Sequence, residues 1–193
     1  YENRMKRIFD ILAITLRFFI LIPIVLLVSL MVKFKLGSPI FFKQFRPGLN
    51  GKVFNMIKFR TMTCVCDENA DLLPDSQRLT KFGKFLRSTS LDELPQFFNV
   101  LVGNMSVVGP RPHMLKHTQD FSEELEIFMV RHKIKPGITG LAQTKGYRGE
   151  TDDFEKRKNR VKMGLFYIKN WSFLFDVGII VDTGLDIFRE RKE

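Results

Sequence analysis

The chain begins with one long hydrophobic segment, and shorter segments in which apolar and polar residues alternate or mix follow it. Residues 8–32 are overwhelmingly apolar and are interrupted by Asp10, Arg17 and Pro23. As one helix these residues would extend roughly 37 Å, which is enough to cross a bilayer. Pro23 lies near the middle and lacks a backbone donor, so it predicts a bend in the helix.

Both ends of this segment are basic. The flanking residues are Arg4, Lys6 and Arg7 before it, and Lys33 and Lys35 after it. Positive flanks favour the cytoplasmic side of a membrane, and a simple crossing can place only one end there. We therefore predict a re-entrant helix-break-helix over residues 1–36, with both ends cytoplasmic. An ordinary spanning helix is the alternative.

The remaining pattern predicts one compact cytosolic domain over residues 37–193, of mixed α/β class and rich in helix. Short strands are expected at 39–42 and 53–60, joined through a turn at 46–51. Helices are expected at 81–87, from the Ser90 region to 101, at 123–130, at 153–169 and at the C-terminal end. The result would be a small sheet with amphipathic helices, of which the last either packs on the core or lies in the membrane interface.

The charge balance narrows the class of partner. A net charge of +10 indicates an anionic partner: nucleic acid, an acidic membrane surface or a phosphorylated substrate. The basic residues are scattered and no nucleic-acid-binding motif occurs, so nucleic acid ranks last and we expect none. No Walker A or G-x-G-x-x-G pattern is present. Cys64 and Cys66 are too sparse for a disulfide framework and suit a reducing compartment.

The pair Asp92 and Glu93 is the strongest candidate for chemistry. Ser90 and Glu93 fit a capping box, and by that interpretation the acids only begin a helix. Pro95 would then be the fifth helical residue and would remove a backbone bond. The alternative is that two adjacent carboxylates in a basic protein hold a divalent metal and attack a phosphate. Spacing alone favours the helix cap, and the rest of the chain shifts the prediction to a catalytic pair.

Several cations are candidates for binding phosphate. Lys58 and Arg60 share one face of a predicted strand, where they are either a solvated edge or aimed at an anion. Arg111 stands between Pro110 and Pro112, which hold its backbone stiffly and suit a guanidinium that meets phosphate oxygens. His113 and His117 lack a third ligand and are expected to be exposed polar side chains rather than a metal site.

Six segments in order give the chain a resemblance to a known family. They are Lys6-Arg7 with Asp10 before a proline-broken helix, Arg46-Pro47-Gly48, Lys58-Phe59-Arg60-Thr61-Met62, Ser90-Leu91-Asp92-Glu93-Leu94-Pro95-Gln96, Gly109-Pro110-Arg111-Pro112, and Lys135-Pro136-Gly137-Ile138-Thr139-Gly140. Together they resemble the bacterial sugar transferase family, the monotopic polyprenyl-phosphate phosphoglycosyl transferases. Residues 146–151 resemble its exopolysaccharide-priming branch, whose catalytic domain follows an N-terminal membrane region. One departure is Ile22, where many relatives have Ser before the proline.

The resemblance implies an enzyme at the cytoplasmic face of the bacterial inner membrane. It would transfer hexose-1-phosphate from a UDP-sugar to undecaprenyl phosphate and release UMP. Asp92 would be the nucleophile and a ligand of Mg²⁺, and Glu93 would orient the metal or acceptor or take a proton. The implied substrate-binding residues are Lys58, Arg60, Arg87, Arg111, Gln143 and Arg148. A non-catalytic module that binds anionic phospholipid is the alternative, and the sequence leaves the sugar and the existence of a homo-oligomer open.

Overall fold

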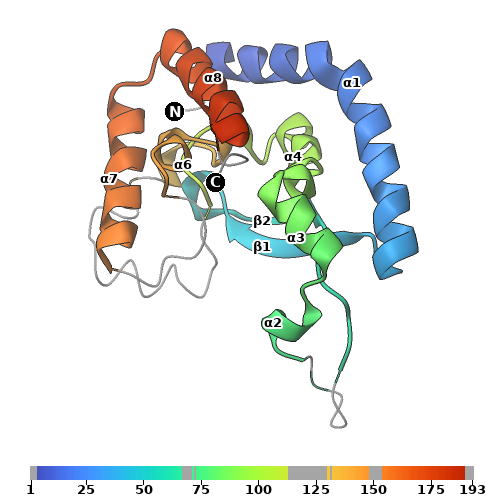
Figure 1. The fold of residues 1–193 in the computed structure, drawn as a ribbon. Coiled ribbons are helices and arrows are strands. Elements are labelled where there is room, and N and C mark those ends of the chain that lie inside the picture. Colours follow the sequence, from blue (N-terminus) through green and yellow to red (C-terminus); the bar gives the residue numbers. More distant parts are fainter. Residues whose placement is uncertain are drawn as a thin grey trace.

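The N-terminal apolar segment forms one long helix. A computed structural model describes residues 4–66, 71, 73–112, 130, 132–147 and 154–189. Helix α1 spans Arg4–Leu36 and contains Pro23, and Figure 1 shows that it bends about its middle. Within the described residues, only its segment Phe19–Leu36 is long and apolar enough to cross a membrane, and just 11% of that segment is buried. A core helix of a soluble domain would be mostly covered by protein, and this segment is not.

A β-hairpin follows α1. Strand β1 (Phe41–Pro47) pairs antiparallel with β2 (Val53–Phe59). The second strand matches its prediction to within one residue. The first runs on to Pro47 instead of ending at 42, because the short turn η1 (Leu49–Gly51) is enough to reverse the chain. Arg46 therefore belongs to a strand rather than to the predicted turn.

Three short helices and a turn follow the hairpin, and of these α4 and η2 pack against β2. Helix α2 spans Asp75–Arg78, α3 spans Lys81–Ser88, the 3-10 turn η2 spans Leu91–Glu93, and α4 spans Gln96–Val102. Thr80 caps α3 by accepting from the Gly83 amide at 3.0 Å. A Cβ at Gly83 would lie 1.8 Å from the Thr61 carbonyl oxygen, so α3 approaches the segment that follows β2 this closely only with glycine. Gly103, at a φ of 95°, ends α4 as predicted.

The C-terminal half adds a second pair of strands and two long helices. Strand β3 (Ser106–Val108) pairs parallel with β4 (Gly137–Thr139), and α6 (Leu141–Thr144), α7 (Phe154–Lys169) and α8 (Phe173–Arg189) follow. A Cβ at Gly137 would lie 2.1 Å from the Gly109 nitrogen, so these strands pair only where both glycines stand. Where one small sheet was predicted, the described residues form two separate two-stranded sheets.

The apolar residues gather in two clusters that fix the bent helix to the domain. One joins Ile14 of α1 to Val100, Val108 and Tyr167, and the other joins Val28 and Val32 of α1 to Phe59 and Leu86. Figure 1 shows α4 within the angle of the two arms of α1. The predicted helix at 123–130, apart from Val130, lies outside the described residues, as do His113, His117 and Arg148.

Candidate active site

The acid pair lies on a tight turn, not at the start of a helix. Ser90 adopts a left-handed conformation with a φ of 55° and makes no side-chain cap. The capping-box interpretation is therefore wrong, and α4 begins only after Pro95, which occupies its N-cap position. Pro95 removes no helical bond there, because the first amides of a helix have no intrahelical partner. The turn η2 packs against β2 and α3, which supply Lys58 and Arg87, and Arg111 comes from the segment after β3.

Glu93 is held by two cations. Its Oε1 accepts from Lys58 Nζ at 2.7 Å and from Arg111 Nη2 at 2.7 Å, and its Oε2 accepts from Arg111 Nη1 at 3.3 Å. Burial would raise the Glu93 pKa, but the charges of Arg111 and Lys58 outweigh burial and lower this pKa to about 2. Glu93 therefore stays ionised at all physiological pH values and is a weak base.

Asp92 lies in a different environment although it is the adjacent residue. Its side chain is buried, and no hydrogen bond or ion pair reaches its carboxylate from the part of the chain that the structure describes. Burial raises the Asp92 pKa to about 6, partly offset by Lys58 and reinforced by the Glu93 charge. A carboxylate with a raised pKa is more basic and hence more nucleophilic, yet it remains largely ionised at neutral pH. The pair thus separates into one fixed and one available carboxylate.

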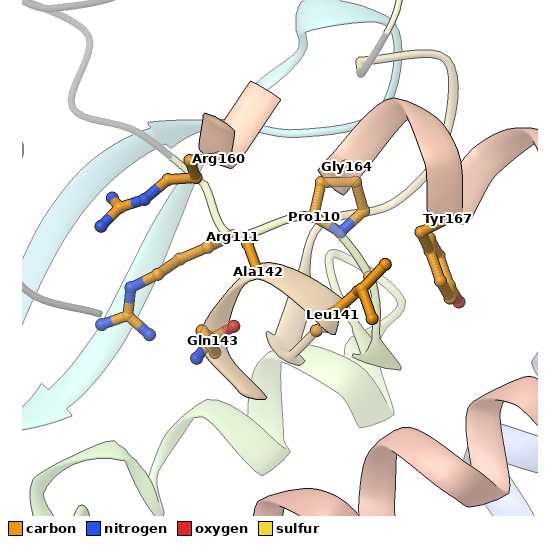
Figure 2. Close-up of a pocket in the computed structure, with 10 residues that line it drawn as sticks. Pro110, Arg111, Leu141, Ala142, Gln143, Arg160, Gly164 and Tyr167 are labelled. Atoms are coloured by element: carbon orange, nitrogen blue, oxygen red, sulfur yellow. The ribbon is translucent and has the colours of Figure 1, made fainter. Parts of the chain in front are cut away.

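A pocket lined by cations and an amide adjoins the pair. Arg111, Gln143 of α6 and Arg160 of α7 line it together with Tyr167. Figure 2 shows Arg111 and Arg160 extending their guanidinium groups in the same direction, away from Tyr167. Burial and the Arg111 charge both lower the Arg160 pKa, to about 10. Arg160 Nη2 donates to the Tyr147 carbonyl at 2.8 Å, and Arg111 is paired with Glu93, so the pocket brings together two cations whose charges repel each other.

Gln143 has a free acceptor in this pocket. Its Nε2 donates to the Ile138 carbonyl at 3.1 Å, whereas its buried Oε1 has no partner among the described residues. Buried polar atoms are normally hydrogen-bonded, so this oxygen is suited to accept from a bound ligand. The sequence argument placed Gln143 at the ligand, and the structure brings it into the same pocket as Arg111.

Two arginines of this region were not among the predicted site residues. Arg46 lies close enough to Arg111 for the two charges to interact. Burial and the Arg111 charge lower the pKa of Arg46 to about 10. It donates to Gln44 Oε1 at 2.6 Å. Arg160 stands in a helix with many cations, and nothing in the pattern marks it out. The Arg46-Pro47-Gly48 motif could have indicated Arg46 as a site residue. Only the tertiary structure indicates Arg160.

The other predicted cations occupy different places. Arg87 of α3 is exposed, donates from Nε to Thr61 Oγ1 at 3.1 Å, and lowers the pKa of Asp92 through its charge. Arg60 is buried at the end of α1, where it donates to the carbonyls of Leu36 and Ser38. The structure thus brings Lys58, Arg87 and Arg111 to the acid pair but assigns Arg60 to holding α1. Lys58 and Arg60 diverge because Arg60 follows the end of β2.

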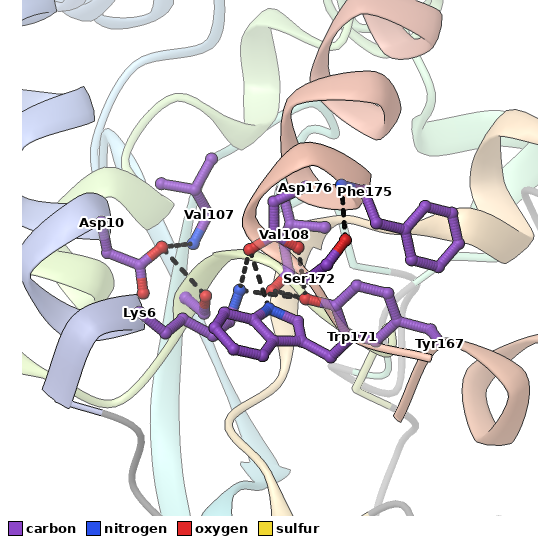
Figure 3. A network of polar contacts seen from close by, with 10 residues as sticks. Lys6, Asp10, Val107, Val108, Tyr167, Trp171, Ser172, Phe175 and Asp176 are labelled. Carbon is purple, nitrogen blue, oxygen red and sulfur yellow. Dashed lines mark hydrogen bonds and ion pairs between the residues drawn. The ribbon is translucent and has the colours of Figure 1, made fainter. Parts of the chain in front are cut away.

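A buried polar network fixes the first turn of α1 to the domain. Lys6 Nζ donates to Asp176 Oδ2 at 2.6 Å and to Tyr167 Oη at 2.9 Å, and Tyr167 Oη donates to Asp176 Oδ1 at 2.6 Å (Figure 3). Asp10 accepts from the Ser106 hydroxyl and from the Val107 amide, each at 3.0 Å. Because Tyr167 also lines the pocket, this network connects the N-terminal end of α1 to the pocket that holds Arg111 and Arg160.

The donor set fits a magnesium ion that is shared with a substrate. Within the described residues no group of three or more acidic, histidine or cysteine side chains can hold a metal alone. Mg²⁺ commonly takes only one or two carboxylates and completes its shell with water and substrate phosphates. Asp92 is the available ligand, since Glu93 is engaged by two cations.

These features define a class of protein: a helix-rich domain with one long, exposed apolar helix, in which a buried carboxylate without a partner among the described residues lies near arginines suited to phosphate chemistry. The family model for bacterial sugar transferases matches residues 1–190, and the chain belongs to that family.

Named relatives confirm the family and its exopolysaccharide-priming branch. The chain is similar to the UDP-glucose:undecaprenyl-phosphate glucose-1-phosphate transferase of Klebsiella pneumoniae, 49% identical over 92% of this chain and 39% of that protein. It is also similar to the exopolysaccharide production protein PSS of Rhizobium leguminosarum bv. phaseoli, 40% identical over 93% of this chain and 92% of that protein. A third relative is the UDP-N-acetylgalactosamine-undecaprenyl-phosphate N-acetylgalactosaminephosphotransferase of Aeromonas hydrophila, 37% identical over 93% of this chain and 42% of that protein. The chain thus spans about two fifths of the first and third relatives.

Proposed function

We propose that the chain transfers a sugar-1-phosphate from a UDP-sugar to undecaprenyl phosphate at the cytoplasmic face of the bacterial inner membrane, releasing UMP. The observation that carries this proposal is the division of the acid pair into a buried Asp92, which has no partner in the described parts of the chain, and an ion-paired Glu93. An anionic-lipid-binding module has no need of a buried carboxylate with a raised pKa, so the arrangement favours an enzyme. The names of the relatives support the donor and acceptor classes.

The first step is attack by an Asp92 carboxylate oxygen on the phosphorus that carries the sugar. A new P–O bond forms to Asp92, the P–O bond to the nucleoside monophosphate breaks, and UMP leaves with that electron pair. In the second step an oxygen of undecaprenyl phosphate attacks the same phosphorus. The bond to Asp92 then breaks, which restores the free carboxylate and gives the lipid-linked diphosphate sugar.

The surrounding residues divide the remaining tasks. Arg111 and Arg160, with Arg46 near Arg111, are placed to bind the diphosphate, and the Gln143 oxygen accepts from the nucleotide or the sugar. Glu93 fixes Lys58 and Arg111 beside Asp92, and its low pKa favours this orienting role over proton transfer. Mg²⁺, held by Asp92 and phosphate oxygens, would supply charge neutralisation for an anion that attacks an anion.

The two arms of α1 favour re-entry over crossing. The first turn is bound to the domain through Lys6, and the Leu36 carbonyl at the other end accepts from Arg60. Both ends therefore attach to the same domain, whereas a spanning helix would have its ends on opposite sides of the bilayer. A shallow insertion would also keep the active site near the interface where the lipid phosphate lies.

The proposal is tested with purified protein in lipid vesicles, by measuring the UMP released and the labelled sugar transferred. Purified protein is incubated with UDP-glucose or UDP-N-acetylgalactosamine carrying a labelled sugar, with and without undecaprenyl phosphate and Mg²⁺. We expect UMP release, a protein-bound label in the absence of acceptor, and loss of both in EDTA with recovery on adding Mg²⁺.

Asp92→Asn should abolish the protein-bound label and UMP release, and Asp182→Asn, at an exposed position of α8, is the matched control. Full transfer by Asp92→Asn would exclude Asp92 as the nucleophile. A wild-type protein that releases no UMP from any UDP-sugar would instead favour the lipid-binding module.

A further inference from the structure

Asp10 of α1 is bonded to a strand that leads into the candidate active site. It is 2% exposed, and its Oδ1 accepts from the Ser106 hydroxyl and from the Val107 amide, each at 3.0 Å (Figure 3). Both donors belong to β3, whose only strand partner within the described residues is β4. Asp10 therefore bonds to a buried amide that no described strand pairs.

Arg111 is attached directly to this pair of strands. Only Gly109 and Pro110 separate it from β3, and both are bonded to β4. The Gly109 amide donates to the Thr139 carbonyl at 2.9 Å, and the Pro110 carbonyl accepts from the Gly137 amide at 3.1 Å. The ring of Pro110 also fixes its φ. We call β3, β4 and residues 109–110 the strand unit, and a shift of this unit displaces Arg111.

The contacts of Arg111 at the site depend on its exact position. Its two terminal nitrogens donate to Glu93 at 2.7 and 3.3 Å, and it lines the pocket that also contains Gln143 and Arg160. A bidentate guanidinium contact requires both N–H groups to be aligned with their acceptors. Side chains of a binding site must be held within about 0.5 Å of their productive geometry by the residues behind them.

We propose that Asp10 is a positioning residue, which fixes the strand unit and thereby sets where the Arg111 guanidinium meets the diphosphate of the substrate. Asp10 itself does not line the pocket. This inference rests on the proposed function, because that function assigns Arg111 to the diphosphate. Asp10 and the apolar segment Phe19–Leu36 belong to one helix, so the helix proposed to enter the membrane also orients a phosphate-binding arginine.

The test is a double-mutant cycle between Asp10 and Arg111, with the Kd of labelled UDP as the readout. Wild type, Asp10→Ala, Arg111→Met and the double variant are compared by equilibrium dialysis in lipid vesicles with Mg²⁺. Asp10→Asn is the conservative variant, since its Oδ1 can accept both bonds. Thr15→Ala is the matched control on α1, because the Thr15 hydroxyl donates only to the Ile11 carbonyl of the same helix, at 2.8 Å.

We expect Asp10→Ala to raise the Kd for UDP by roughly tenfold, since a misplacement of about 1 Å can cost up to about 100-fold. In the Arg111→Met background the same change should alter the Kd by less than about twofold, because no guanidinium is left to misplace. Asp10→Asn should bind UDP about as tightly as wild type, and so should Thr15→Ala.

A merely structural role for Asp10 predicts a different pattern. Asp10→Ala would then raise the Kd by the same factor in both backgrounds, and this result would overturn the proposal, as would an unchanged Kd in Asp10→Ala. If Trp171 fluorescence shows that Asp10→Ala does not fold, Ser106→Ala enters the cycle in its place, because it removes one of the two bonds. Its Kd should rise less, again only where Arg111 is present, and an unchanged Kd would count against the proposal.

The same measurements separate this inference from the proposed function. A wild type that binds UDP but releases no UMP from any UDP-sugar would refute the proposed function, whereas the cycle would still decide the role of Asp10. A wild type that does not bind UDP would refute both.

Discussion

Replacing Asp92 by asparagine is expected to remove activity and also to stabilise the fold at neutral pH. Asp92 is 8% exposed, and burial is the main cause that raises its pKa. A carboxyl group whose pKa is raised by folding binds its proton more tightly in the folded state than in the unfolded state. The free energy of unfolding therefore falls as pH rises from about 4 to about 6, and the penalty is complete above that window.

The magnitude follows from the two pKa values. The Asp92 pKa rises from the ordinary 3.8 to about 6. Each pKa unit corresponds to about 1.4 kcal/mol, so ionisation of Asp92 lowers the stability of the fold by about 3 kcal/mol at pH 7.5. Asparagine has nearly the same shape and no charge, so the variant regains this energy. For a chain of this size the gain corresponds to a Tm higher by about 6–12 °C.

The assay is thermal unfolding in detergent with EDTA present, followed by the fluorescence of Trp171, the only tryptophan in the sequence. The variant should exceed wild type in Tm at pH 7.5 and match it at pH 4, where both side chains are neutral. Asp182→Asn on the exposed face of α8 should show no such pH-dependent gain. A Tm for Asp92→Asn at or below wild type at pH 7.5, or a gain that persists at pH 4, would refute the reasoning.

Two further predictions concern the site and the membrane helix. The transfer activity should fall as the pH is lowered, with a midpoint near pH 6, the pKa of Asp92. Lys58→Met should move this midpoint to higher pH, because the Lys58 charge lowers the Asp92 pKa. An unmoved midpoint would argue against Asp92 as the titrating group. In a Cys64→Ser, Cys66→Ser background, cysteines at Met5 and at Lys35 should both react with an impermeant maleimide only in inverted vesicles. Reaction of one of them in intact spheroplasts would establish a spanning helix.

Local signals in the sequence were sufficient for most of the elements. The strand at 53–60, the helix at 81–87 and the glycine stop at Gly103 are confirmed, because periodicity and helix-ending residues act within a few positions. Such local signals could not predict which strands pair when the strands are far apart in the sequence. The pattern gave no indication that β3 pairs with β4, since that contact depends on two glycines far apart in the chain, Gly109 and Gly137.

The candidate active site was likewise predictable in part from the sequence and in part only from the tertiary structure. The sequence by itself determined the family, the acid pair and the bent apolar helix, because adjacent residues and a long apolar segment are recorded directly in residue order. Only the tertiary structure distinguished Asp92 from Glu93, moved Arg60 to the end of α1, and brought Arg160 beside Arg111. The physical reason is that burial and charge proximity set the pKa and the partner of each side chain, and both are properties of the folded chain.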